Sequence, residues 1–363
     1  MADLKNHISP ELAGQLVKEL RYAWPAFDGE RFTTGLDAEL QPLELMDRVG
    51  LLADRLSEVL PAEFTDGAGV LWRALESDTF TDWMILPCSR YVSDAGLANP
   101  DVALPLLAGM TPRWSSEFAV RPFIEHHPDV AYAHFHRWMS DSDEHVRRLV
   151  SEGTRPRLPW ASRLRALMDD PSPNIELLDH LAGDPSEYVR RSVANHLNDI
   201  SKDHPDLVVE IARRWNDLGH AWVVRHGLRS LVKAGDPDAM ALLGVATHAR
   251  IRLADLRVDP ETVTIGGEIT LAFVLELEDA APVEAIVDYR VHYAGANGTR
   301  RRPRVFKLAR RMLEPGTPEM FSRRHALKPV SIRRIYPGRH TVDVWVNGTV
   351  LGSVDLTVLP MAE

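Results

Sequence analysis

A helical unit that occurs more than once is the feature that most constrains the fold of this chain. The segments EHVRRLVSEGTRPRLPW (residues 144–160) and EYVRRSVANHLNDISKDHPDL (residues 187–207) each place an acidic residue before a Val-Arg-Arg triplet. Each then has a carboxylate near the expected helix end and a basic residue three positions later: Glu152 and Arg155 in the first copy, Asp199 and Lys202 in the second. Helical units that recur at long spacing are typical of stacked-helix arrays.

The copies align on one valine each. The valines matched in EHVRR, EYVRR and AWVVRH are Val146, Val189 and Val223, and a weaker copy surrounds Val120 in FAVRPFIEHHPDV. The spacings of 43 and then 34 residues fall in the range of HEAT-type repeats, so the pattern predicts an α-α superhelix. Two interpretations of the matched arginines stay open: they extend a solvated helix surface, or they form a working face.

The pattern changes near residue 250. Before it, apolar residues recur at three- and four-residue spacing, and pairs such as Ser9-Pro10 and Asp184-Pro185 indicate helix starts. After it, segments rich in Val, Ile and Thr alternate with turn residues, and Asn347-Gly348 predicts a tight hairpin. We therefore expect a multidomain α plus β protein, with a HEAT-like α-solenoid over residues 1–248 and an all-β immunoglobulin-like sandwich over residues 249–363. The expected strands lie within 262–278, 285–294, 304–313 and 340–359.

Charge is distributed unevenly along the chain. The formal net charge of −10 would by itself argue against nucleic-acid binding. However, residues 1–100 carry 8 Lys/Arg against 17 Asp/Glu, whereas residues 300–339 carry 13 against 2. Attraction of phosphate depends on the local field, so the basic segment is a candidate nucleic-acid surface.

The cysteine count and the hydropathy pattern indicate the cellular compartment and the absence of disulfides. Its one cysteine, Cys88, excludes an internal disulfide and a multi-cysteine metal site. No apolar run reaches membrane length, and the first residues lack the build of a signal peptide, so we expect a cytoplasmic protein without a membrane partner. The 15 histidines, including His126-His127 and His134-x-His136, are interpreted as core edges or surface, and no metal is expected.

The segments SEGTRPRLPW and VRRSVANHLNDISKDHPDLV resemble the bacterial DNA alkylation-repair glycosylases of the AlkC type, in the AlkC/AlkD superfamily of HEAT-like repeats. The resemblance spans essentially the whole chain and is most specific over residues 113–230. A C-terminal immunoglobulin-like domain occurs in some members. The resemblance implies hydrolytic removal of N3-methyladenine from alkylated double-stranded DNA without a metal or redox cofactor, by a protein that associates with the nucleoid when bound to DNA.

Three carboxylates are the candidate catalytic groups. Methylation leaves the adenine cationic, so the enzyme must mainly stabilise an oxocarbenium-like sugar and direct a water to it, which calls for a carboxylate beside the deoxyribose. Glu152 follows Arg148 by four residues on one helix face, which would otherwise be an ordinary surface ion pair. The family motif makes Asp199 the first choice for directing the water, against a plain pairing with Lys202 or His196. Glu117 is expected at the corresponding place on the preceding helix, where Ser115 or Ser116 could make it an ordinary early-turn acid.

Two tryptophans are candidates for contact with the lesion. Trp160 follows two prolines in an arginine-flanked loop, which suits packing against a cationic base, although tryptophan is more often buried core. Trp114 is the second candidate. The superfamily resemblance implies catalysis on bent DNA without a deep base pocket, and the sequence shows no aromatic cage that would contradict this.

Basic residues flanking these acids are the expected phosphate contacts, without sequence preference. In the basic C-terminal segment, TRRRPR is expected to contact the same duplex. The complete set is Arg148, Arg155, Arg191, Lys202, Arg225, Arg229, Arg300, Arg301, Arg302 and Arg304.

Two functions from different classes remain. One is a monofunctional glycosylase for N3-methyladenine, with removal of N7-methylguanine as a broader variant and no lyase activity, because no lysine stands out as a nucleophile. The other is a non-enzymatic HEAT scaffold that binds DNA or protein through the same face. A scaffold gains nothing from three carboxylates on that face, which favours the enzyme. We expect a monomer without an obligate protein partner.

Overall fold

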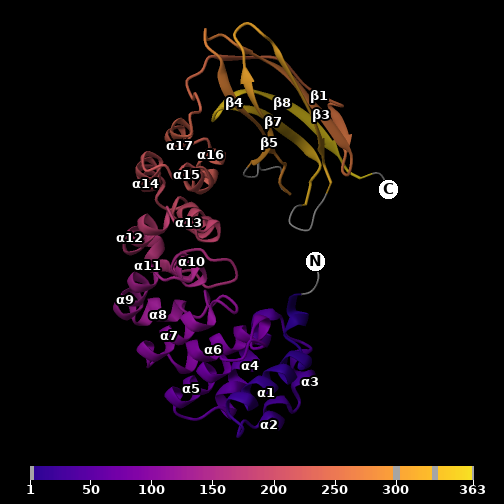
Figure 1. The fold of residues 1–363 in the computed structure, drawn as a ribbon. Helices are drawn as coiled ribbons and strands as arrows, with labels where there is room; N and C mark the ends of the chain where they lie inside the picture. The colour runs from indigo at the N-terminus through magenta and orange to yellow at the C-terminus, as the bar shows by residue number, and fades with distance from the viewer. Residues whose placement is uncertain (1–3, 297–302, 329–333, 362–363) are drawn as a thin grey trace. The chain divides into compact units, whose positions relative to one another are not determined.

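The computed structural model describes residues 4–296, 303–328 and 334–361 (Figure 1). Its contacts divide the chain into two compact units, residues 1–227 and 228–363. The first is entirely helical, and the second joins two short helices to a β-sandwich. The expected boundary at residue 248 follows the change of secondary structure, whereas the contacts group the last two helices with the strands.

The helical unit contains η1 (Leu4–His7), α1 (Pro10–Ala23), α2 (Gly29–Thr33), α3 (Leu36–Leu40), α4 (Leu45–Val59), α5 (Phe64–Ala74), η2 (Asp82–Met84), α6 (Ile85–Ala95), α7 (Pro100–Met110), α8 (Arg121–His126), α9 (Pro128–Trp138), α10 (Glu144–Gly153), α11 (Arg165–Asp169), α12 (Ser172–Leu181), α13 (Glu187–Ile200), α14 (Pro205–Asp217) and α15 (Ala221–Gly227). No helix in the described part of the chain is both long and apolar enough to span a membrane.

Local capping chemistry begins several of these helices where the sequence predicts. Ser9 is the N-cap of α1 and accepts the Leu12 N–H at 3.3 Å, with Pro10 in the first helical position. At Asp184-Pro185 the helix begins later than expected, because Ser186 is the N-cap and α13 starts at Glu187. The Asp184 carboxylate instead forms an ion pair with Arg147 of the preceding repeat.

The predicted repeat is present as a stack of helices. α10 packs on α13, and α13 packs on α15. In Figure 1 these three helices follow one another along one side of the helical unit, with α12 and α14 on the other side. The matched valines Val146, Val189 and Val223 are all buried, as is Val120 just before α8. The repeated valines therefore form the core of the superhelix.

The β-unit begins with α16 (Arg229–Ala234) and α17 (Pro237–Leu242) and continues with eight strands: β1 (Ile251–Asp259), β2 (Thr262–Thr264), β3 (Glu268–Leu277), β4 (Val283–His292), β5 (Arg304–Leu313), β6 (Glu319–Ala326), β7 (Gly338–Val346) and β8 (Thr349–Leu359). One sheet has the order β1-β3-β6, and the other β2-β8-β7-β4-β5. Alternating apolar residues from both sheets fill one core between them, which confirms the sandwich.

Two strands lie outside the expected set, and one turn confirms its prediction. β1 and β6 were not predicted because a strand with few buried residues shows a weak apolar alternation. In β6 only Phe321 and His325 are buried. The β7–β8 hairpin turns on Asn347 and Gly348, whose φ values are 48° and 84°. Such positive φ angles are what the Asn-Gly pair favours in a two-residue hairpin.

Candidate functional site

The three candidate carboxylates lie in one chain of alternating charges within the helical unit. Arg148 Nη1 donates to Glu117 Oε2 at 2.8 Å and its Nη2 lies 3.7 Å from Glu152 Oε1. Arg155 continues the chain, since its Nη1 donates to Glu152 Oε1 at 2.6 Å and its Nε to Asp199 Oδ2 at 2.9 Å. Residues separated by more than 80 positions in sequence are thereby joined through two arginines.

Glu152 is the central and deeply buried member of this chain. It lies in the last turn of α10, with a side chain only 7% exposed. Its second oxygen, Oε2, accepts the Ser192 hydroxyl of α13 at 2.6 Å, and the same hydroxyl lies 3.0 Å from Ser151 Oγ. A buried carboxylate needs such partners, because the loss of water would otherwise strongly disfavour its charge.

Asp199 lies in the last turn of α13 and is the most buried of the three acids. Its Oδ2 accepts from Arg155, and Lys202 Nζ donates to its Oδ1 at 2.8 Å. These two cations hold a carboxylate that the helix dipole would disfavour at a C-terminus.

His196 is not a partner of Asp199 in the bonds of the described residues. Its Nδ1 lies 2.9 Å from the Ser151 carbonyl, and its Nε2 lies 3.3 Å from the Asn174 side chain. Burial lowers the pKa of His196 to about 3, the nearby Arg155 charge acting in the same direction, so the ring is neutral at neutral pH.

Glu117 differs from its expected position. It lies in a turn before α8 rather than on a helix, because the chain between α7 and α8 makes only turns. Ser115 does not cap a helix there; its hydroxyl donates to Glu117 Oε2 at 2.7 Å and accepts from Arg148 Nη1 at 3.0 Å. No partner within the described residues is recorded for Glu117 Oε1, so one oxygen of this acid is open.

The two arginines of the chain are held by the acids. Burial by itself lowers the pKa of Arg148, but the charges of Glu117 and Glu152 outweigh it, and the net pKa is raised. Arg155 is in the same situation between Glu152 and Asp199. Arg148 also stands 4.8 Å from the ring centroid of Tyr188. Both guanidinium groups are therefore fixed and charged.

A cavity of about 460 Å³ opens beside these acids. Glu117 and Glu152 line it, and Asp199 does not. Its aromatic lining consists of Trp83, Trp114, Phe118, His145, Trp160 and Tyr188. The expectation that no aromatic cage exists is wrong, because aromatic residues from η2, α10, α13 and two loops are brought together only by folding.

The lining tryptophans are of two kinds. Trp114 packs against Trp83 with ring centroids 5.1 Å apart, and Trp83 in turn stacks on His7 at 4.5 Å. The Trp160 side chain is 68% exposed. Its backbone has a φ of 66°, a left-handed conformation that residues other than glycine rarely adopt. Trp114 is thus held in place by its packing on Trp83, whereas Trp160 is an exposed ring on a strained backbone.

The chain is similar to known proteins in both sequence and fold. Residues 252–360 match the family described as the C-terminal Ig-like domain of the uncharacterised protein YhaZ. The chain is 35% identical over 367 residues to the uncharacterized protein YhaZ of Bacillus subtilis, covering 99% of this chain and 100% of that one. It superposes with a TM-score of 0.90 and 36% identity on Pseudomonas fluorescens alkylpurine DNA glycosylase AlkC bound to DNA containing an abasic site analog, covering 98% of this chain and 99% of that one.

The chain belongs to the AlkC family. It is a member with the C-terminal immunoglobulin-like domain. The remaining candidate cations of this AlkC-type chain are scattered. Arg191 is exposed on α13 and paired with Glu187, and Arg225 is exposed on α15. Arg229 begins α16 and Arg304 begins β5 in the β-unit, whereas Arg300, Arg301 and Arg302 lie outside the described residues.

Sequence reasoning missed several residues of this AlkC-type site. Trp83, Tyr188 and Ser192 lie in no pattern that marks them, although Tyr188 stands inside the repeated EYVRR segment. Arg121 lies in the weaker repeat copy around Val120, where no sequence pattern singles it out, and it is buried. Burial of a polar residue in an amphipathic helix is decided by its neighbours in space, which the sequence does not reveal.

Proposed function

We propose that this chain is a DNA glycosylase that hydrolyses the N-glycosidic bond of N3-methyladenine in alkylated double-stranded DNA. Support comes from the likeness over 98% of its length to a protein described as an alkylpurine DNA glycosylase bound to DNA. The observation that carries the proposal is the cavity in which Glu117 and Glu152 face tryptophan rings. A protein that only held phosphates would have no use for buried acids there.

The chemistry needs negative charge near the sugar. A base methylated at N3 already carries a positive charge, so it leaves without further protonation. As it leaves, positive charge develops on C1′ and the ring oxygen of the sugar, and a nearby fixed carboxylate stabilises that charge. The cavity is lined by such carboxylates, which are held by Arg148, Arg155 and Ser192 and need no rearrangement during the reaction.

The hydrogen bonds suggest separate roles for the acids. Glu152 has both oxygens occupied and is the more buried of the two acids that line the cavity, which suits a fixed charge beside the sugar. Glu117 has one open oxygen, which suits acceptance of a proton from the attacking water. Asp199 has both oxygens occupied and acts through Arg155, which it shares with Glu152. In this proposal Asp199 orients Glu152 rather than directing the water itself.

The aromatic walls suit a cationic planar base. A positive ring stacked on the face of tryptophan is attracted by the ring quadrupole. Trp160 is exposed and can contact the lesion, while Trp114 and Trp83 line the same cavity and pack against each other. Neutral adenine lacks this attraction, which would favour the methylated base.

Phosphate binding is assigned to the exposed cations. Arg191 and Arg225 of the helical unit and Arg304 of the β-unit are exposed, and Lys202 is 43% exposed. Arg148 and Arg155, both largely buried among the acids, would contact DNA only through the cavity.

We also propose that the reaction stops at base release. Lys202 is the lysine beside the acids, and its ammonium donates to Asp199. An ammonium engaged by a carboxylate is a poor nucleophile for a Schiff base with the sugar. The abasic product should therefore keep an intact DNA backbone, as checked on a denaturing gel.

The test is release of free base from methylated duplex DNA by the wild type, Glu152→Gln and Asp199→Asn. We expect the wild type to release N3-methyladenine and Glu152→Gln to lose about 100-fold or more in single-turnover rate. Asp199→Asn should lose less, and both should retain duplex binding. No release by a folded wild type that still binds duplex DNA would overturn the enzyme and leave the scaffold.

A further inference from the structure

Arg121 is a buried arginine without an acidic partner. It opens α8, is 2% exposed, and forms no ion pair among the residues that the structure describes. Its Nη1 donates to the carbonyls of Gly153 at 2.9 Å and Arg155 at 2.8 Å. Its Nη2 donates to the carbonyl of Ser162 at 2.6 Å. All of its recorded acceptors are backbone oxygens of one segment.

That segment carries much of the candidate site. Gly153 ends α10 one residue after Glu152, and the loop after α10 (residues 154–164) contains Arg155 and Trp160. Arg121 contacts the beginning of this loop and its far side at Ser162, so one guanidinium joins both ends. Residues 153–156, at the junction of α10 and this loop, are buried. The carbonyls of Gly153 and Arg155 accept hydrogen bonds from Arg121, and a buried carbonyl needs such a donor.

The side chain is a cation in spite of its burial. Burial lowers the pKa of Arg121 to about 10, while Glu125, Glu117 and Asp199 act in the opposite direction. The group is therefore protonated at neutral pH. Removing a charged group from water is unfavourable, and carbonyl dipoles compensate less than a carboxylate would. A neutral apolar residue would fill this place at lower cost if packing were the only need.

We propose that Arg121 is a positioning residue of the glycosylase reaction, which holds the loop after α10 so that Arg155 meets Glu152 and Trp160 borders the cavity. This inference rests on the proposed function. It assigns no contact between Arg121 and DNA. Its effect passes through the carbonyls of Gly153 and of Arg155 itself, and through the carbonyl of Ser162, two residues after Trp160.

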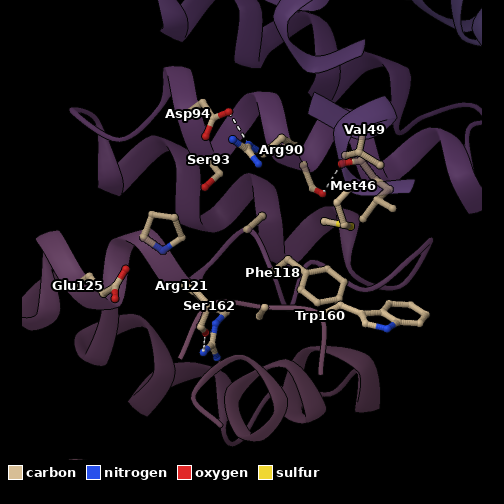
Figure 2. Close-up of a pocket in the computed structure, with 15 residues that line it drawn as sticks. Met46, Val49, Arg90, Ser93, Asp94, Phe118, Arg121, Glu125, Trp160 and Ser162 are labelled. Atoms are coloured by element: carbon tan, nitrogen blue, oxygen red, sulfur yellow. Dashed lines mark hydrogen bonds and ion pairs between the residues drawn. The ribbon is translucent and has the colours of Figure 1, made fainter. Parts of the chain in front are cut away.

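A second cavity gives access to Arg121. This cavity of about 360 Å³ is lined by Arg121, Trp160 and Ser162 on one side and by Arg90 and Asp94 of α6 on the other (Figure 2). Trp160 lines both cavities. A small guanidinium ion can therefore enter the space that an Arg121→Ala substitution would open. Arg90 lines the same cavity but is half exposed and paired with Asp94, so Arg90→Ala is the matched control.

The first experiment measures single-turnover base release from methylated duplex DNA with saturating enzyme. We expect Arg121→Ala to be slowed about 10- to 100-fold, as for a catalytic group displaced by about 1 Å, with duplex affinity retained. Ethylguanidinium, at concentrations below those that shift thermal unfolding, should restore part of the rate. Arg121→Lys should keep more activity than Arg121→Ala because it retains a cationic donor. Arg90→Ala should match the wild type and show no response to ethylguanidinium.

The second experiment needs no DNA. Acrylamide quenching of Trp160 fluorescence is obtained as the difference between each protein and the same protein carrying Trp160→Phe. We expect Arg121→Ala to change this quenching and ethylguanidinium to reverse the change. The proposal is overturned if Arg121→Ala keeps wild-type rate and quenching, or if its rate falls only as its folded fraction falls, without rescue. If the wild type itself releases no base, the glycosylase function fails, and the quenching comparison alone decides whether Arg121 holds the loop.

Discussion

At the scale of single residues, Trp160 combines an exposed ring with an unfavourable backbone. Its φ of 66° costs a residue with a Cβ roughly 1 kcal/mol, a penalty that glycine does not have. Non-glycine residues in such conformations concentrate at functional sites. The exposed ring contributes little to the core, which agrees with the proposed contact between Trp160 and the lesion.

Replacing Trp160 separates these two properties. We expect Trp160→Gly to be more stable than Trp160→Ala by about 1 kcal/mol, because only glycine tolerates the positive φ. Both variants should release N3-methyladenine more slowly than the wild type, since both lack the ring. Urea unfolding followed by circular dichroism and single-turnover assays measure the two effects. Equal stability of the two variants would contradict the account of strain.

His196 makes a pH-dependent contribution to stability. Its pKa is about 3 in the folded protein against an ordinary value of 6.5, so between these values the unfolded chain binds more protons. Stability is therefore full above about pH 6.5 and falls as the pH drops below it, by at most about 1.4 kcal/mol per pH unit. His196→Asn retains a donor that can reach the Ser151 carbonyl and cannot titrate. Between pH 6.5 and 5.5 the wild type should lose about 1 kcal/mol more than this variant in urea unfolding, and parallel losses would refute the assignment.

At the scale of elements, the two arginines of each Val-Arg-Arg triplet have different tasks. The first arginine closes the loop before its own helix: Arg147 donates to the carbonyls of Asp141 and Ser142, and Arg190 to those of Asp184 and Pro185. The second arginine varies, since Arg148 joins the acids whereas Arg191 is exposed. The two interpretations of the matched arginines therefore both concern the second arginine, which joins the candidate acids in one copy and lies on the helix surface in the other, whereas the first arginine closes a loop.

A pair of neighbouring substitutions tests this division. Arg190→Ala removes two hydrogen bonds to carbonyls and should lower the free energy of unfolding by about 1–3 kcal/mol, with duplex affinity unchanged. Arg191→Ala removes one exposed i,i+4 pair and should change stability by less than about 0.5 kcal/mol, but weaken duplex binding. Chemical denaturation and fluorescence anisotropy with a labelled duplex give the two readouts. A large stability loss for Arg191→Ala together with weaker duplex binding by Arg190→Ala would contradict this division of roles.

At the scale of the whole molecule, the net charge is negative although the β-unit carries many exposed basic residues. Arg304, Lys307, Arg310 and Arg311 are exposed on β5, and Arg323 and Arg324 on β6. These strands belong to different sheets of the sandwich. The overall charge of −10 therefore does not describe this unit, because the acidic residues are concentrated in the first 100 positions, with 17 Asp/Glu against 8 Lys/Arg.

Salt dependence of duplex binding measures how many of these charges contact phosphate. Each contact contributes about −0.9 to the slope of log affinity against log salt. Replacing Arg304, Arg323 and Arg324 with serine should weaken duplex binding and reduce the magnitude of the slope by up to about 3. The control replaces three exposed arginines of the helical unit outside the expected contacts, Arg31, Arg137 and Arg213. An equal effect of both triple variants would argue against a DNA-contacting β-unit.

Features that depend on near neighbours along the chain could be predicted from the amino-acid sequence. The periodic valines at 146, 189 and 223 are buried, Ser9 caps α1, and Asn347-Gly348 turns the hairpin, because each outcome follows from a local dihedral preference or a helical period. Glu152 and Asp199 could be selected for the same reason, since a helix end is visible in the sequence. The family resemblance added the reaction, which no local pattern contains.

Contacts between side chains that are distant in sequence could be found only in the folded protein. Glu117 reaches Arg148 from a turn, Trp83 and Tyr188 line the cavity from distant segments, and Arg121 is buried against a loop more than 30 residues away. The open oxygen of Glu117 and the full occupancy of Asp199 likewise depend on neighbours brought from other helices. Such contacts are governed by packing across long sequence separations, where the same residue types could equally have remained in solvent.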